Sequence, residues 1–299
     1  MTTNPIEASA VALLLGFGAS MALAQSTIGQ ESAWSARLPK DDKVSYQGAA
    51  NFDGAGGGAG AMLYPAPGVA GLIAAVLTHA AIVNGVRNSE KSRLQEEADK
   101  VLSPYQETLV ALTHRALMQR ALEKSAAGGS RSLIEASAAG GDAWVVESTP
   151  VFLFTQDQRA IVLENTVAIY APGGLPSAAP AYKNVVRIVS RPQLAEAVPT
   201  EWNANQGERL KETSAELLAR SFDLAIGDAS RPRADNTAPH RTFRYQEGGA
   251  ERMERAQLVS EGCDRIVIRT LRGWLMSIPA PERAAADPPC GEVASAPTK

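Results

Sequence analysis

Apolar and polar residues alternate with a period of two over much of the second half of the chain, a pattern typical of half-buried β-strands. The polar run Gln156-Asp157-Gln158 separates two such stretches and predicts a hairpin turn. Short breaks that contain glycine or polar residues separate four later stretches and predict an antiparallel meander. The predicted strands cover 144–154, 161–169, 185–189, 241–246, 251–260, 264–270 and 273–278.

Helical spacing of apolar residues marks other parts of the chain. It predicts helices over 68–102 and 103–124, where Ser103, Pro104 and Gln106 form a capping box at the second start. A further helix is predicted over 207–225, between the two sets of strands. The pattern as a whole predicts an α+β fold, with N-terminal helices followed by a mainly antiparallel sheet that contains one inserted helix. The helical segment 61–127 is expected to pack on the sheet region 143–278.

Residues 1–24 resemble a secretory signal peptide, because the charge-free run from Ala10 ends in Ala22-Leu23-Ala24 before Gln25. Signal peptidase requires small side chains at these positions. The segment before the run contains Glu7 and no Lys or Arg, which is unusual for an export signal and favours the alternative of an ordinary buried helix. Cleavage after Ala24 would leave a mature chain of 275 residues, obtained by subtracting 24 from 299.

Two segments have the composition of connectors. Residues 25–60 are polar and then rich in glycine, and they predict a linker. Gly54, Gly56 and Ala59 match the spacing of a dinucleotide-binding loop, but no apolar strand precedes them, and no acidic residue occurs between Asp53 and Glu90 to bind a ribose. Residues 279–299 are rich in proline and alanine and predict a disordered tail.

No charged residue occurs between Gly54 and Val86, counting histidine as neutral. Small side chains at alternating spacings of three and four would form one face of a helix there and allow another helix to approach closely. Residues 66–86 are also about as long as the roughly 20 residues that cross a bilayer. The alternatives are a packed or self-associating helix and a membrane-inserting segment. The face consists of Gly71, Ala74, Thr78, Ala81 and Gly85.

The composition excludes several classes of protein. The chain has 45% apolar residues and a formal net charge of -3. It is therefore too apolar to be wholly disordered and too balanced in charge for a nucleic-acid scaffold. Two cysteines in 299 residues are too few for a fold that is built on disulfides.

The sequence contains no established catalytic motif. It lacks a nucleophile elbow, a zinc-binding H-E-x-x-H pair and a phosphate-binding loop. The histidines at 79, 114 and 240 have no cysteine or carboxylate at metal-ligand spacing. We therefore expect no catalytic residue, no metal and no cofactor.

Arginine is concentrated near the C-terminus. Residues 231–283 contain ten arginines, no lysine and seven acidic residues, a local net charge of +3. Guanidinium groups bind carboxylates and phosphates, so Arg265, Arg269 and Arg272 are candidate ligands for an anionic envelope component. The alternative is that these arginines pair with glutamates on neighbouring strands.

These observations predict a periplasmic or exported, non-catalytic accessory or assembly protein of the bacterial cell envelope. Its expected partners are envelope proteins or a second copy of the chain, and not nucleic acid. Two alternatives stay open. One is an envelope hydrolase or transferase whose site is dispersed in the sequence, and the other is a membrane-anchored subunit that spans at 66–86.

We predict a disulfide between Cys263 and Cys290, the alternative being two unpaired thiols. A bridge of this loop size stabilises a fold by roughly 3–4 kcal/mol in the chain-entropy model. Intact mass after alkylation, with and without prior reduction, measures the thiols. Reduction should add two alkyl groups, and an unchanged alkylation count would rule the bridge out.

Overall fold

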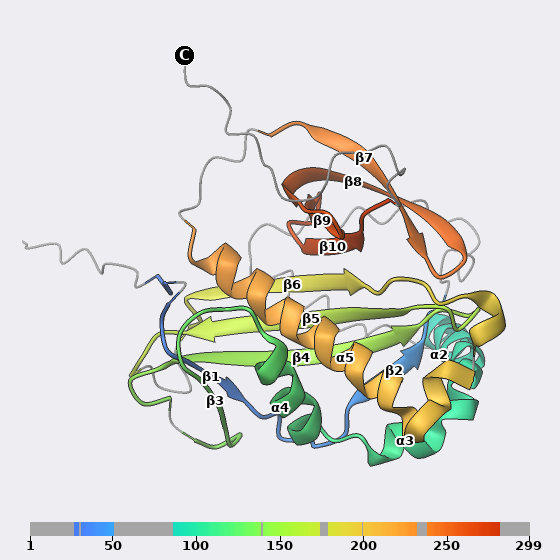
Figure 1. Ribbon diagram of the computed structural model, residues 1–299, viewed down its shortest axis with the longest axis horizontal. Coiled ribbons are helices and arrows are strands. Elements are labelled where there is room, and N and C mark those ends of the chain that lie inside the picture. Colours follow the sequence, from blue (N-terminus) through green and yellow to red (C-terminus); the bar gives the residue numbers. More distant parts are fainter. Residues whose placement is uncertain are drawn as a thin grey trace, which may run out of the picture.

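The computed structural model describes residues 27–29, 31–50, 86–138, 140–173, 179–198, 200–231 and 238–281. Ten strands form one sheet in this part of the chain, in the order β3-β1-β4-β5-β6-β10-β9-β8-β7, and β2 pairs with β4 outside this path. The helices α4 and α5 lie across one face of the sheet (Figure 1). The β7–β8 hairpin forms one end of the strand order.

The elements have the following bounds. The strands are β1 (Trp34–Arg37), β2 (Ser45–Gly48), β3 (Arg131–Ile134), β4 (Trp144–Phe154), β5 (Ile161–Tyr170), β6 (Tyr182–Val189), β7 (His240–Glu247), β8 (Ala250–Glu261), β9 (Arg265–Thr270) and β10 (Leu275–Pro279). The helices are α2 (Val86–Asp99), α3 (Gln106–Ala111), α4 (His114–Lys124), α5 (Thr200–Ala229) and the 3₁₀ helices η1 (Lys100–Tyr105) and η2 (Ala195–Ala197).

The α+β class is confirmed, and the sheet is mixed: among the described strands five pairs are antiparallel and four shorter pairs are parallel. The predicted β4–β5 hairpin and the meander from β7 to β10 are antiparallel. Parallel pairs occur where the chain returns to the sheet from a distance, as β1 does beside β3 and β4, β2 beside β4, and β10 beside β6. Parallel neighbours need long connections, so a pattern of successive hairpins does not reveal them.

The described chain begins with strands, so the prediction that N-terminal helices come first is not supported. Residues 34–37 and 45–48, within the predicted 25–60 linker, form β1 and β2. Both strands are only four residues long and of mixed polarity, and tertiary contacts hold them. The Tyr46 ring stacks on Phe152 of β4 with 4.9 Å between centroids, and its hydroxyl donates to Ser214 of α5 at 2.7 Å.

Gly48 allows α2 to approach the end of β2 closely. A β-carbon at Gly48 would overlap the backbone carbonyl of Ala98. The Gly48 N–H donates to the Asp99 carboxylate at 2.8 Å, and its carbonyl accepts from the Gln95 side chain at 3.0 Å. The end of α2 is therefore fixed to the sheet by both backbone groups of one glycine.

The main core lies between the sheet and helix α5. The predicted 207–225 helix is confirmed, and it extends past Gly227 to Ala229. The residues before it form a separate turn, because the backbone from Ala204 to Gly207 is not helical. Gly207 has φ of +74°, and a β-carbon there would overlap the side chain of Thr108, so this position requires glycine. Fully buried side chains of this core include Trp34, Tyr105, Phe152, Phe154, Trp202 and Phe222.

A second, smaller core lies on the other face of the sheet, inside the curl made by β7 to β10. Apolar residues of the predicted meander share this face with two residues of β5 and β6, as their alternation in the sequence indicates. The members are Val162, Val189, Phe243, Ala256, Ile266, Ile268, Met276 and Ile278.

The predicted helix over 103–124 is broken into η1, α3 and α4. Leu112 adopts an extended conformation, and Thr113 caps α4 by accepting a hydrogen bond from the Ala116 N–H at 3.2 Å. Ser103 lies inside η1 and is not a cap. Thr113 therefore provides the N-cap that the sequence pattern assigned to Ser103, since a threonine hydroxyl can accept from an N–H of the first helical turn.

Several predicted features lie outside the described residues. They are the signal peptide 1–24, the glycine-rich part of the linker, the small-residue face from Gly71 to Gly85, and residues 282–299 of the predicted tail. Among the helices that the structure describes, none is long and apolar enough to cross a membrane.

The β4–β5 turn, residues 155–160, contacts three other parts of the fold. Its Asp157 carboxylate accepts from the Gly249 N–H of the β7–β8 turn at 2.5 Å. Its Gln158 carbonyl accepts from the Trp202 indole at 2.7 Å, and the Gln158 side chain accepts from the Tyr105 hydroxyl at 2.5 Å. Gln158 reaches both partners with φ of +59°, an uncommon value for a residue other than glycine.

The charge of Asp157 is stabilised by these contacts. Burial alone raises the pKa of its carboxyl, but hydrogen bonds from the Thr155 hydroxyl and from the backbone of Arg159 and Gly249 outweigh burial. The pKa therefore lies below its usual value. The folded state binds a proton less readily here than the unfolded state does, so Asp157 stabilises the fold above the unfolded pKa, about 3.9. This contribution is lost as the pH falls through the folded pKa.

We predict that Asp157→Asn lowers the free energy of unfolding at neutral pH by about 1 kcal/mol, since the side chain is exposed and solvent screens its contacts. Urea denaturation at neutral and acidic pH measures this. The difference from the unmodified chain should shrink below about pH 4, where the unfolded chain binds the proton first, and it should vanish at the lower pH where folded Asp157 is protonated. Asp142→Asn, which alters an exposed carboxyl, is the control and should leave stability unchanged. Equal stability of the two variants would contradict this role for the turn.

Candidate functional site

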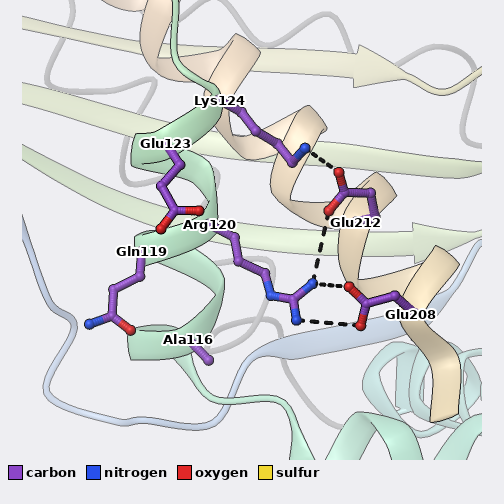
Figure 2. Close-up of a pocket in the computed structure, with 7 residues that line it drawn as sticks. All are labelled: Ala116, Gln119, Arg120, Glu123, Lys124, Glu208 and Glu212. Carbon is purple, nitrogen blue, oxygen red and sulfur yellow. Dashed lines mark hydrogen bonds and ion pairs between the residues drawn. The ribbon is translucent and has the colours of Figure 1, made fainter. Parts of the chain in front are cut away.

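A hollow on the described surface lies between α4 and α5. It is an open groove of about 640 Å³, and Figure 2 shows its side chains. On α4, the helical repeat places residues 116, 120, 123 and 124 toward one side, and Glu208 and Glu212 follow one another at the same spacing on α5. The lining residues are Ala116, Gln119, Arg120, Glu123, Lys124, Glu208 and Glu212.

Ion pairs connect the two helices across the groove. The Arg120 guanidinium donates to both carboxylate oxygens of Glu208 and lies 3.9 Å from an oxygen of Glu212. Lys124 donates to the other oxygen of Glu212. Glu123 has no such dashed contact in Figure 2, and it makes no ion pair within the described part of the chain. Its carboxylate is close enough to Arg120 for an electrostatic interaction, but it is not paired with that guanidinium.

These ion pairs keep the groove residues charged. The hydrogen bond from Arg120 lowers the pKa of Glu208, and the same bond raises the pKa of Arg120. The hydrogen bond to Glu212 raises the pKa of Lys124. A general acid or base works best with a pKa near the working pH. The shifts here move each pKa away from neutrality, which suits charge complementarity and not proton transfer.

The three arginines that the sequence suggested as one binding face have different partners in the structure. Arg269 pairs with Asp228 of α5 at 2.5 Å, and Arg272 lies over the ring of Trp274. Arg265 is largely buried and donates to the carbonyl oxygens of Val189 and Ser277. Their role in binding an anion stays a prediction.

Some C-terminal arginines pair with glutamates on a neighbouring strand, which is the alternative to ligand binding. Arg244 pairs with Glu251 at 2.9 Å, and Arg241 lies 3.7 Å from Glu261, in both cases between β7 and β8. Such exposed pairs contribute little to stability individually. They account for part of the arginine content without a ligand.

Sequence reasoning missed a partly buried charge cluster between the two halves of the sheet. Arg187 of β6 donates to Glu247 at the end of β7 at 2.8 Å and also to Glu164 of β5. Burial lowers the pKa of Arg187, but its two carboxylate partners outweigh burial and raise it. Glu164 and Arg187 are direct partners in the β5–β6 register, and a correct strand alignment would have paired them.

The predicted disulfide is partly within the described chain. Cys263 lies in the turn between β8 and β9, whereas Cys290 lies outside the described residues. No free cysteine occurs in the part that the structure describes, which is compatible with the bridge. The pairing stays a prediction. In the same part of the chain, no three His, Cys, Asp or Glu residues are placed to hold a metal ion.

Comparison of the chain with protein-family models, with curated proteins and with solved structures finds no match. The geometry of the described residues therefore carries the functional argument. In that geometry the α4–α5 groove is the candidate interaction site.

We predict that Arg120→Ala lowers the free energy of unfolding by less than about 1 kcal/mol, because the Arg120–Glu208 pair is solvent-exposed. Thermal unfolding at low and high NaCl measures this, and salt should reduce the difference. The stability should also depend on pH, because the pKa of Glu208 is lowered in the fold. The contribution of Glu208 to stability is present above its unfolded pKa, about 4.3, and is lost as the pH falls through the folded pKa.

Gln119→Ala is the matched control for Arg120→Ala, because Gln119 lines the same groove without a charge. It should show no dependence on salt. A much larger loss in Arg120→Ala would show that the ion pairs hold the helices together. A loss that salt leaves unchanged would show that it does not come from the ion pairs.

Proposed function

We propose that the protein is a non-catalytic accessory or assembly protein of the bacterial cell envelope that acts through protein–protein contacts at the α4–α5 groove. The observation that carries this proposal is the fixed array of charges in the groove. Arg120 and Lys124 are each held by a glutamate of α5, and the pKa of each shifted group moves away from neutrality. Such an array favours recognition of a polar partner over acid–base catalysis.

The chemistry of the groove suggests the partner's contacting surface. Three glutamates and two basic residues line it, and Glu123 makes no ion pair in the described chain. A lysine or arginine of a partner would complete this charge pattern. Electrostatic complementarity of this kind contributes mainly to the association rate and to specificity.

The envelope location rests on the sequence of residues 1–24, where a charge-free run ends in Ala22-Leu23-Ala24. The proposal expects cleavage after Ala24 and export of the remaining chain. The membrane-anchored alternative depends on residues 66–86, which lie outside the described part. Extraction of membranes with carbonate separates the two, because a spanning subunit stays in the pellet.

Site-specific photo-crosslinking in intact cells tests the contact. A crosslinking residue at Gln119 should form adducts with envelope proteins, and Glu208→Gln together with Glu212→Gln should reduce their yield. The control position is Thr149, which is exposed and alternates with the core residues of β4, so it points to the face opposite the helices.

Two outcomes would contradict the proposed function. One is equal crosslinking from Gln119 and Thr149, or no loss when the glutamates are changed, which would remove the groove as the contact site. The other is a chain that retains residues 1–24 and crosslinks only to cytoplasmic proteins, which would remove the envelope location.

A further inference from the structure

Three arginines from separate parts of the fold surround one aspartate where β6, α5 and the β8–β9 turn meet. Arg191 follows β6 and donates to the backbone carbonyl of Asp264 at 3.2 Å. Arg220 of α5 lies 3.6 Å from the Asp264 carboxylate. Arg265, the next residue in the chain, begins β9. Three guanidinium groups thus lie around one acidic residue, and its single carboxylate, which pairs with Arg220, leaves a surplus of two positive charges.

This excess of arginine over carboxylate is not found at four other arginines of the described chain. Arg187 has two glutamate partners, and Arg120 lies near two as well. Arg37 and Arg269 each pair with one carboxylate. Around Asp264, by contrast, the positive charges are not neutralised by side chains of the fold.

Arg265 is held in place with part of its guanidinium unused. Its Nε donates to the Ser277 hydroxyl at 2.8 Å, and its Nη2 donates to the carbonyl oxygens of Val189 and Ser277. Its Nη1 has no acceptor in the described part of the chain and is not among the buried, unpartnered atoms there, so it is open to solvent. Burial and the charges of Arg220 and Arg191 lower the pKa of Arg265 to about 10, which still leaves it charged at neutral pH.

We propose that Arg191, Arg220 and Arg265 form a binding site for a phosphate group. A phosphate carries close to two negative charges at neutral pH and has several acceptor oxygens, which matches a surplus of two charges on three separate donors. The planar guanidinium binds such oxygens in pairs. Arg265 is the fixed member, whereas Arg191 and Arg220 are more exposed and can turn toward the anion. This site does not depend on the α4–α5 groove.

Isothermal titration calorimetry with inorganic phosphate tests the site on the full mature chain. The variant combines Arg191→Ala with Arg220→Ala. Each lost charged contact should weaken binding about 10-fold, the usual range for charge-assisted hydrogen bonds. The control combines Arg115→Ala with Arg244→Ala, which changes the net charge equally at two exposed arginines that already have glutamate partners. Thermal unfolding verifies that both variants fold, and Arg191→Ala alone serves if the double variant does not.

Flotation with phosphatidylglycerol vesicles separates the two sources of a phosphate group. Binding of inorganic phosphate without flotation identifies a soluble phosphate compound as the ligand. Flotation that the Arg191/Arg220 variant loses, and that inorganic phosphate competes away, identifies a lipid headgroup. The proposal is overturned if the unmodified chain binds neither probe, or if the cluster variant and the control variant bind equally well.

Discussion

The β4–β5 turn is the point on which the arrangement of the other elements depends. Asp157 holds the tip of the β7–β8 hairpin, and Gln158 holds both Trp202 at the start of α5 and Tyr105 at the end of η1. A turn of a few residues therefore sets the position of a helix, a helical connection and a hairpin relative to the central strands. The left-handed backbone at Gln158 is the local strain that this role requires.

Arginine serves three physical purposes in this fold, and its burial and its balance with nearby carboxylates distinguish them. Arg187 is partly buried between two glutamates and joins the two halves of the sheet. Arg120 lies on the surface and connects two helices. Arg265 lies among like charges. Only the third setting leaves charge unneutralised, so it is the one in which a ligand would add to stability.

Local patterns in the sequence predict those strands whose pairing partners are the next elements along the chain. The β4–β5 hairpin and the β7–β10 meander follow from alternation and turn residues. The strands β1 and β2 could not be found in this way, because four residues show no period and their parallel partners come much later in the chain. For the same reason, composition drew attention to Arg265 but could not supply Arg191 and Arg220, which only the fold brings beside Asp264.

The contact between Gly48 and the end of α2 has a consequence for how the chain can change over evolution. The chain leaves the sheet after Gly48 and is fixed to it again at Gln95 and Asp99, so the fold itself holds the two sides of the intervening stretch together. Gly48 therefore tolerates no larger residue during evolution, because any β-carbon there would overlap the Ala98 carbonyl and separate the end of α2 from β2.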